Sequence, residues 1–517
     1  MAESSVPERP ENRHVAAVEA LLGDPATHGG LPVERRETHA ALVFLAGDDA
    51  YKIKRPVRYD YLDFSTPEKR AAMLRREMEL NAPAAPELYL GLVAVTRAPD
   101  GTLALHGTGQ PVEWALHMRR FPAGAELSKI AAAGGLDRAM AERLGAGIAA
   151  YHAAAPRRDT DGAELIGEIV TELDAAFAGM TDVLPADRVA VYRARIGAAW
   201  RAVQPLLTAR TRAGHVRRGH GDLHLGNIVA LDGRPVPFDA LEFDERLGTM
   251  DVLYDLAFLL MDLRHAGLPE AANTVMNRYF FHAGDPAQLD GLAALPLFLA
   301  LRAAIRAMTT VQAARLDGTG DAAGQVARGY LDDAVAFLSP PPARLIAIGG
   351  LSGTGKTTLA RDLAPGIGPV PGALHLRSDL LRKAHMGVDA LTRLPDSAYA
   401  SGINAAVYDM MFDRAERALG AGHAVVLDGV FLHAAERDAA RDLARAAGVA
   451  FDGIWLEAAA GTMLDRVTAR IGDASDADAR VVRLQLDAAP AVTDWRRLDA
   501  DGPREATLAA ARAALSG

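Results

Sequence analysis

A glycine-rich octapeptide at residues 350–357 constrains the fold of this 517-residue chain more than any other stretch. It reads Gly-Leu-Ser-Gly-Thr-Gly-Lys-Thr, which has the spacing G-x-x-x-x-G-K-T of a phosphate-binding P-loop. An apolar segment, Leu345–Ile348, precedes it, and helix-forming residues begin at Lys356. The order strand, loop, helix is the start of an α/β domain with a mostly parallel sheet. This order disfavours the alternative of a Gly-rich turn without function.

The residue types in the octapeptide suit a bound triphosphate. Glycines let backbone N–H groups wrap phosphate oxygens, and the helix N-terminus adds positive potential. We expect Lys356 to bridge the β- and γ-phosphates and Thr357 to ligate Mg²⁺. The candidate nucleotide-binding residues of this loop are Gly350, Ser352, Gly353, Thr354, Gly355, Lys356, Thr357 and Thr358.

Strand and helix signals alternate after the octapeptide. The stretches 373–383 and 423–432 are predicted to hold the second and third strands, which end near Asp379 and Asp428. Ligands of such sheets lie outside the carboxyl ends of the strands. Asp379 is therefore a candidate to orient an acceptor hydroxyl, and Asp428 is a candidate for the metal shell. Capping of a helix N-terminus is the alternative for each.

Two arginines precede a polar loop at residues 471–480. Arg466 and Arg470 are four residues apart on a predicted helix and so share one face. This composition is typical of a mobile lid whose arginines close over phosphates. A solvated charged helix is the alternative.

A second motif, His-Gly-Asp-Leu-His-Leu-Gly-Asn, occupies residues 220–227. The spacing D-x-x-x-x-N is that of kinase catalytic loops, in which Asp222 would accept or orient the proton of the attacking hydroxyl and Asn227 would hold Mg²⁺. Asp239 follows the apolar residues 236–238 and would supply a second metal carboxylate. The alternative is a plain loop with a turn-forming Asp and Asn.

Two lysines upstream are candidates to bind phosphates. Lys52 and Lys54 lie on a predicted strand after a hairpin turn at residues 47–49, and their i, i+2 spacing puts both side chains on one face. A helix predicted from Thr66 carries Glu77 and Glu79, and one of these should pair with the lysines. A solvated basic strand edge is the alternative.

Two further positions complete the first predicted site. Residues 114–121 should form the last strand before a hinge, where backbone groups near Met118 would bind adenine; a plain edge strand is the alternative. The apolar stretch 250–267 reads as a buried helix, and its Asp251 or Asp255 should anchor the catalytic loop. His152 is expected to be a packed or capping histidine.

Composition limits the class of protein. The chain has no cysteine, which excludes disulfides and thiolate metal sites, and its net charge is −10, which disfavours nucleic acid as a partner while leaving a local basic groove open. We find no apolar run of about 20 residues and no apolar signal core, so we expect a cytoplasmic protein without a membrane span. Oligomeric state is not predicted.

Proline-rich residues 339–343 mark a stiff linker. We therefore predict a domain at 1–338, with a small lobe at about 25–120 and a helical lobe at about 121–338, and a second domain at 344–517.

The motif at 220–227, together with FDALEFDE at 238–245 and YDLAF at 254–258, resembles the aminoglycoside phosphotransferase family of kinase-like enzymes over roughly residues 30–335. The resemblance implies a bilobal α+β fold, with Asp222 as catalytic base, Asn227 and Asp239 on Mg²⁺, and Lys52 or Lys54 on phosphates. No Gly-x-Gly-x-x-Gly loop occurs near 33–45, where residues 38–40 would cover the nucleotide. The second half resembles P-loop small-molecule, polynucleotide and zeta-toxin-like kinases, and the whole resembles a bacterial fusion of the two.

The expected function is therefore phosphotransfer at two nucleotide sites with ATP or GTP and Mg²⁺. The first module would phosphorylate a hydroxyl of a small molecule, such as a sugar or amino alcohol, and the second would be another kinase or a regulatory ATPase. Alternatives are a P-loop module that acts on a nucleic-acid 5′ end or a nucleotide-sugar, and a nucleotide-dependent regulator.

Overall fold

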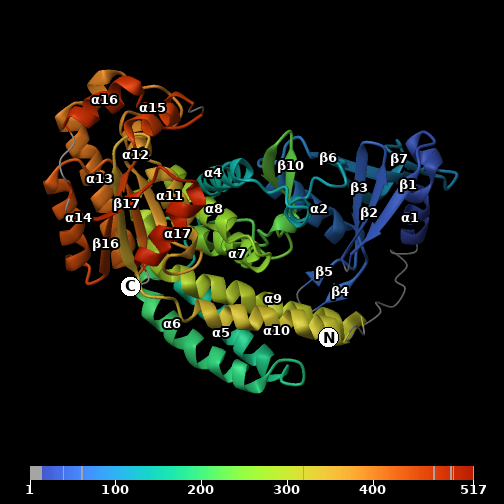
Figure 1. Ribbon diagram of the computed structural model, residues 1–517. Coiled ribbons are helices and arrows are strands. Elements are labelled where there is room, and N and C mark those ends of the chain that lie inside the picture. Colours follow the sequence, from blue (N-terminus) through green and yellow to red (C-terminus); the bar gives the residue numbers. More distant parts are fainter. Residues whose placement is uncertain are drawn as a thin grey trace. The chain divides into compact units, whose positions relative to one another are not determined.

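The computed structural model describes residues 14–38, 40–59, 62–317, 320–469, 472–488, 492 and 494–515. The chain forms two compact units (Figure 1). Unit 1 is Met1–Gly162 with Thr211–Leu259, and unit 2 is Ala163–Arg210 with Leu260–Gly517. Much of the helical segment predicted for the first domain therefore clusters with the P-loop sheet. The division at the proline-rich residues 339–343 stays a prediction.

Unit 1 begins with an antiparallel sheet in the order β1-β2-β3-β8-β6-β7. The turn between β2 and β3 lies at the predicted place, and Gly47 has the positive φ of 58° that such a tight turn favours. The predicted helix cap is also confirmed, because Thr66 Oγ1 accepts the N–H of Lys69 at 3.4 Å. The elements are α1 (Val15–Gly23), β1 (Val33–Glu37), β2 (Ala41–Ala46), β3 (Asp49–Lys54), β4 (Arg58–Tyr59), β5 (Leu62–Asp63), α2 (Pro67–Asn81), β6 (Tyr89–Arg97), β7 (Leu103–Leu105) and β8 (Gln110–Arg119).

The rest of unit 1 carries the second motif. A hairpin, β10–β11, pairs Ile228 with Pro237, so Asn227 and Phe238 lie side by side at its open end. A short antiparallel pair, β9–β12, lies before the buried helix α7. The elements are α3 (Leu127–Ala132), α4 (Arg138–Ala154), β9 (Val216–Arg218), β10 (Ile228–Leu231), β11 (Arg234–Pro237), β12 (Thr249–Asp251) and α7 (Val252–His265), the last of which continues into unit 2.

Unit 2 contains a five-stranded sheet in the order β14-β15-β13-β16-β17, and all four pairings are parallel. This confirms the predicted α/β architecture. Ile346, Ile348, Val426 and Ile454 from three adjacent strands form the core with α11 and α17. The elements are β13 (Arg344–Gly350), α11 (Lys356–Leu363), β14 (Leu374–Arg377), α12 (Ser378–His385), α13 (Ser401–Gly420), β15 (Val425–Asp428), α14 (Ala434–Ala446), β16 (Ala450–Glu457), α15 (Ala460–Thr468), α16 (Ala479–Ala488), β17 (Arg496–Asp499) and α17 (Arg504–Leu515).

Unit 2 also contains long helices that precede the proline-rich residues 339–343. They are α5 (Gly162–Ala178), α6 (Ala186–Arg212), α8 (Pro269–Ala283), α9 (Leu295–Asp317) and α10 (Gly320–Phe337), with a 3₁₀ turn, η4 (Pro286–Ala294), before α9. Helix α8 packs against β14, and η4 packs against α13.

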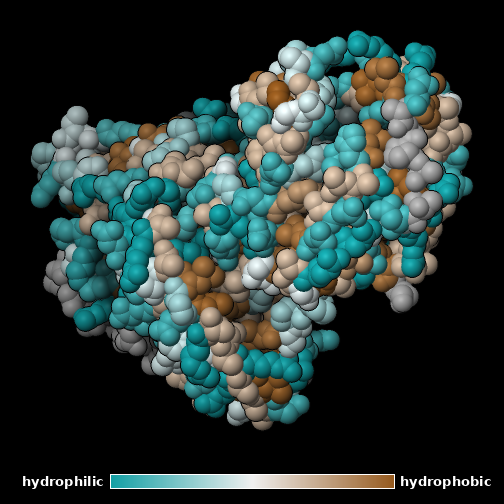
Figure 2. All heavy atoms as spheres, turned by 90° about the vertical axis from the view of Figure 1, so that its left-hand side faces the viewer, coloured by the Kyte–Doolittle hydropathy of each residue, from teal (hydrophilic) through white to brown (hydrophobic). Residues whose placement is uncertain are grey.

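One helical stretch, Pro286–Arg315, is long and apolar enough to cross a membrane, although we expected none. Its most apolar window is 72% buried inside the protein, as in the core helix of a folded domain. The face drawn in Figure 2 is largely hydrophilic, with hydrophobic residues gathered in several smaller areas.

Candidate active sites

The two predicted phosphate lysines meet one buried glutamate. Lys52 Nζ donates to Glu77 Oε1 at 2.7 Å, and Lys54 Nζ donates to Glu77 Oε2 at 2.7 Å. The Glu77 side chain is fully buried. Glu79, the other candidate, is 65% exposed and pairs with Arg76 on the helix surface. The lysines therefore share a face of β3, as their spacing predicted, and Glu77 is their partner.

Each lysine also contacts an acidic residue that follows β11. Lys52 Nζ lies 2.7 Å from Asp239 Oδ1, and Lys54 Nζ lies 2.6 Å from Glu242 Oε1. The role of Glu242 was not predicted, although it lies three residues after Asp239 in the same stretch. Five charged side chains from β3, α2 and the segment after β11 thus form one network.

The network favours the charged forms of Asp239, Lys52 and Glu77. Desolvation acts to raise the pKa of Asp239. The Lys52 ammonium has the larger net effect and lowers this pKa to about 2. Burial acts to lower the pKa of Lys52, and Asp239 and Glu77 raise it well above its usual range. Burial likewise opposes ionisation of Glu77, and the two lysines bring its pKa below the ordinary value. At neutral pH the Lys52 ammonium therefore lies between the carboxylates of Glu77 and Asp239.

The motif at 220–227 brings Asp222 and Asn227 together. Asn227 Nδ2 donates to Asp222 Oδ2 at 3.0 Å and to Asp222 O at 2.9 Å. The N–H of Phe238 donates to Asn227 O at 3.0 Å, and Asp239 is the next residue after Phe238. Asp239 has a positive φ of 60°, and its N–H donates to Tyr89 Oη at 3.0 Å. The loop and the hairpin thus hold all three predicted residues on neighbouring backbone.

Asp255 anchors the loop from α7. Its buried carboxylate accepts the N–H groups of His220 at 2.7 Å and Gly221 at 3.1 Å. His152 Nε2 lies 3.2 Å from the same carboxylate, so this histidine is packed as predicted. Asp251 instead accepts the N–H of Leu253 at the start of α7. Of the two candidates, Asp255 is therefore the anchor.

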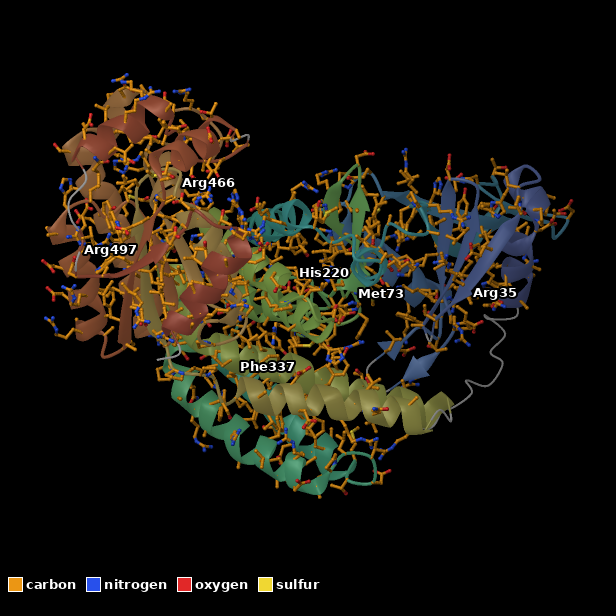
Figure 3. All side chains as sticks on the ribbon, viewed as in Figure 1. Arg35, Met73, His220, Phe337, Arg466 and Arg497 are labelled. Carbon is orange, nitrogen blue, oxygen red and sulfur yellow. The ribbon has the colours of Figure 1, made fainter. Side chains whose placement is uncertain are left out.

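His220 is held as a neutral imidazole (labelled in Figure 3). Burial lowers its pKa below the ordinary value. Its Nε2 donates to Phe238 O at 2.9 Å, and its Nδ1 accepts the N–H of Asp222 at 3.3 Å. The ring thereby ties the catalytic loop to the strand that leads to Asp239.

His224 is a site residue to which we assigned no role from the sequence. Its Nδ1 accepts the N–H of Gly226 at 3.0 Å, so the proton lies on Nε2, 3.5 Å from Asp222 Oδ2. The second histidine of the octapeptide at 220–227 was the available signal.

Met118 lies in β8, opposite Ala50 and Tyr89 of the neighbouring strands. Its side chain is buried in the core of the sheet. The proposed contact with adenine involves backbone groups near this residue and stays a prediction. His39, in the segment expected to cover the nucleotide, lies outside the described residues.

The P-loop of unit 2 requires its glycines. Gly353 has a φ of 87°, and a Cβ there would lie 2.5 Å from Met463 O. Gly350 has a φ of 139°, and a Cβ there would lie 2.7 Å from Leu456 O. Lys356 Nζ donates to Leu351 O at 2.9 Å. The loop is therefore closely packed by β16 and α15.

Thr357 and Asp428, the two residues of the P-loop domain that were candidates to bind a metal, contact each other. Thr357 Oγ1 donates to Asp428 Oδ2 at 2.7 Å, at the end of β15. The same oxygen lies 3.3 Å from His375 Nε2 and 3.7 Å from Arg377 Nε. Burial acts to raise the pKa of Asp428, but His375 and Arg377 lower it to about 2. This side chain is a buried anion that binds Thr357, not a helix cap.

Neither site is a cage of metal-binding side chains. Among the described residues, no group of three or more His, Asp or Glu side chains is arranged to hold a metal ion. One or two protein ligands together with phosphate oxygens are the usual coordination of Mg²⁺. The pairs Asn227–Asp239 and Thr357–Asp428 fit that ion when a nucleotide supplies the remaining ligands.

A cleft of about 870 Å³ opens beside the P-loop. Asp379 lies in the first turn of α12 and lines this cleft. Arg466 of α15 (labelled in Figure 3) also lines it. Arg470 lies outside the described residues. The predicted loop residues that line the cleft are Ser352, Gly353, Thr354, Gly355, Lys356, Thr357 and Thr358, whereas Gly350 does not line it.

The predicted lid is held mainly by carboxylates. Between α15 and α16, Asp473 pairs with Arg377 at 2.9 Å, and Asp478 pairs with Arg393 at 3.2 Å. Asp476 accepts from Lys383 and from Tyr399 Oη. The arginines of this segment were the predicted contacts, and its acidic residues, which are visible in the sequence IGDASDADAR, make the observed ones.

A side chain of α16 also reaches the P-loop. Gln485 Oε1 accepts the N–H of Ser352 at 2.7 Å. Gln485 was not predicted, because nothing in the local sequence links it to a loop 133 residues away.

Comparisons with known proteins match a separate family model to each of the two regions that carry a motif. The phosphotransferase enzyme family matches residues 39–292, and an AAA domain matches residues 345–492. The uncharacterized proteins Rv2004c of Mycobacterium tuberculosis and Mb2027c of Mycobacterium bovis are each 32% identical over 493 residues, which covers 92% of this chain and 94% of theirs.

Solved structures show lower similarity. A choline/ethanolamine kinase family protein from Mesorhizobium loti is 19% identical, with a TM-score of 0.39, over 63% of this chain and 94% of its own. An APS kinase from Mycobacterium tuberculosis, solved with AMPPNP and APS, is 18% identical, with a TM-score of 0.26, over 34% of this chain and 99% of its own.

Proposed function

The chain belongs to the family of these mycobacterial proteins and joins a kinase-like phosphotransferase domain to a P-loop kinase-like domain, and from this premise we propose that it is an ATP-dependent phosphotransferase with two nucleotide sites. One observation carries the proposal. Lys52 bonds at once to the buried Glu77 of α2 and to Asp239 beside the catalytic loop. A phosphate-binding lysine, its helix partner and a metal carboxylate are the parts that phosphoryl transfer requires in one place.

In the first site, Asp222 takes the proton of a small-molecule hydroxyl as that oxygen attacks the γ-phosphorus and ADP leaves. Asn227 and Asp239 hold Mg²⁺, which neutralises charge on the transferring phosphates when it is bound. Lys52 then turns from Asp239 to the phosphate oxygens and keeps its bond to Glu77. The 2.7 Å contact between Lys52 and Asp239 is the resting state of two groups that separate when nucleotide binds.

In the second site, Lys356 and the loop amides hold the triphosphate, and Thr357 and Asp428 hold Mg²⁺. Asp379 orients the acceptor hydroxyl from the first turn of α12, and Arg466 contributes a cation across the cleft. The acceptor is a small molecule with a hydroxyl group. Eight carboxylates and six Lys or Arg side chains are among the described residues that line the cleft, a balance that repels a polyanion such as a nucleic-acid end.

A second candidate function is supported by Gln485. Because this residue of α16, the helix after the predicted lid, occupies the Ser352 N–H, the second module could be an ATPase in which this contact opens and closes with nucleotide and regulates the first module. ATP turnover without any acceptor would favour this regulator. Salt-sensitive binding of RNA or DNA would favour an action on nucleic-acid ends.

The test uses γ-labelled ATP and a cell metabolite extract. The parent protein, Asp222→Asn and Lys356→Ala are each incubated with both, and labelled products are identified by mass. We expect two separable phosphorylation steps, one lost in Asp222→Asn and the other in Lys356→Ala. Glu79→Gln and Arg445→Ala, both at exposed surface ion pairs, are the matched controls in units 1 and 2.

The outcomes separate the hypotheses. If either single substitution abolishes every labelled product, the two steps are not separable and the proposal of two independent sites fails. If Lys356→Ala changes only the rate at which the first product forms, the second module is a regulator.

A further inference from the structure

The strand β14 lies at the edge of the parallel sheet. In the described part of the chain it pairs with β15 on one side and with no strand on the other. An edge strand leaves a row of backbone N–H and C=O groups that must find other partners. The partners of β14 come from α8, a helix that precedes the proline-rich segment by more than 50 residues.

Two asparagines of α8 bond to this edge. Asn273 Nδ2 donates to Ala373 O at 3.0 Å, and Asn277 Nδ2 donates to the same oxygen at 3.3 Å. Asn277 Oδ1 accepts the N–H of His375 at 2.6 Å. The amide of Asn277 therefore donates and accepts as a neighbouring strand would, and it fixes the backbone on both sides of Leu374.

The strand carries this constraint to the P-loop. The N–H of His375 is bound by Asn277, and the His375 side chain contacts the end of β15, where its Nε2 lies 3.3 Å from Asp428 Oδ2. That oxygen also accepts from Thr357 Oγ1 at 2.7 Å. A continuous series of contacts thus runs from α8 through one histidine, fixed at its backbone and at its ring, to the carboxylate beside the P-loop.

We propose that Asn277 and His375 are positioning residues of the P-loop site, and that α8 is a working part of that site. The helix fixes β14, and His375 then orients Asp428 toward the metal that accompanies the nucleotide. This inference rests on the proposed function, because it assigns Mg²⁺ to Asp428. It implies that a helix preceding the proline-rich segment is needed for magnesium-dependent binding at the P-loop that follows that segment.

The expected loss of Mg²⁺ affinity depends on how many contacts separate the substituted residue from the metal. Loss of a group that bonds directly to a metal ligand costs about 10–100-fold in metal affinity. His375→Ala should therefore raise the Mg²⁺ concentration for half-maximal nucleotide binding by at least about 10-fold. Asn277 acts one contact further out, so we expect about 3–10-fold for Asn277→Ala.

The experiment uses the full chain with Asp222→Asn, which removes turnover at the first site. Binding of a fluorescent ATP analogue is titrated with Mg²⁺, and the part of the signal that Lys356→Ala abolishes is assigned to the second site. Thr274→Ala is the matched control on α8, because its hydroxyl bonds within the helix, to Glu270 O. His375→Gln keeps a donor for Asp428, so it should lie nearer the parent than His375→Ala. Asn277→Asp keeps an acceptor for the His375 N–H but turns its second oxygen toward Ala373 O, where Asn277 donates, so it should resemble Asn277→Ala.

The substitution Asp428→Asn separates the proposed role of Asp428 in metal binding from the inference about α8. If it leaves the Mg²⁺ dependence unchanged, the proposed role of Asp428 is wrong. If it changes that dependence and Asn277→Ala and His375→Ala do not, the inference about α8 is wrong. Nucleotide binding without Mg²⁺ and the melting temperature should stay near parental values in Asn277→Ala. If Mg²⁺-free nucleotide binding and the melting temperature fall together with the Mg²⁺-dependent binding, α8 is only a structural support and the inference is wrong.

Discussion

The substitution Glu77→Gln tests the centre of the first site. Glu77 is fully buried, and each of its oxygens accepts from a lysine at 2.7 Å. Glutamine has nearly the same shape but no charge, and its NH₂ group would face one ammonium. Lys52 and Lys54 would each retain one carboxylate, Asp239 and Glu242. The change therefore removes the shared anion and leaves the surrounding packing intact.

Two magnitudes follow. Removal of one partner from a buried ion pair costs about 3–5 kcal/mol, and because both lysines keep a second carboxylate we expect the lower end, about 3 kcal/mol. In a unit of roughly 200 residues this lowers the melting temperature by about 6–12 °C. Displacement of Lys52 by about 1 Å should reduce kcat/KM of the first site by about 100-fold.

The assay requires the first site alone. In the Lys356→Ala background, ATP consumption at varied ATP gives kcat/KM, and calorimetry gives the unfolding transition of unit 1. Glu79→Gln is the control, because Glu79 lies on the same helix, is 65% exposed, and should change stability by less than about 0.5 kcal/mol. If Glu77→Gln resembles Glu79→Gln in both measurements, the lysine network neither stabilises unit 1 nor positions nucleotide.

Two further predictions concern unit 2. Burial lowers the pKa of His423 to about 4, and its Nε2 donates to Gly372 O, so the folded state binds its proton later than the unfolded state as pH falls. Stability should therefore be unaffected above about pH 7 and should fall by roughly 3 kcal/mol between about pH 6.5 and 4, a loss that denaturant titrations should find reduced in His423→Gln. Gln485→Ala frees the Ser352 N–H for phosphate, and the Lys356-dependent nucleotide affinity should rise by about 2–10-fold; a fall would mean that Gln485 contributes to the bound state.

The sequence alone determined the features that depend on local geometry. The P-loop, the hairpin turn at Gly47 and the cap at Thr66 each involve residues within a few positions of one another. For such groups, spacing fixes direction, so the shared face of Lys52 and Lys54 could be predicted before any partner was known. The carboxyl ends of parallel strands also meet at one edge, which is why Asp428 was a candidate beside Thr357.

Only the tertiary structure decided which distant side chains complete these sites. Glu242 reaches Lys54 across 188 positions, Gln485 reaches Ser352 across 133, and Asn277 binds His375 across 98. Such pairs leave no periodic signal, because their distance depends on how whole elements pack and not on the spacing along either one. For the same reason, the proline-rich segment marked a break in the chain but did not reveal that α8 would hold the edge of the second sheet.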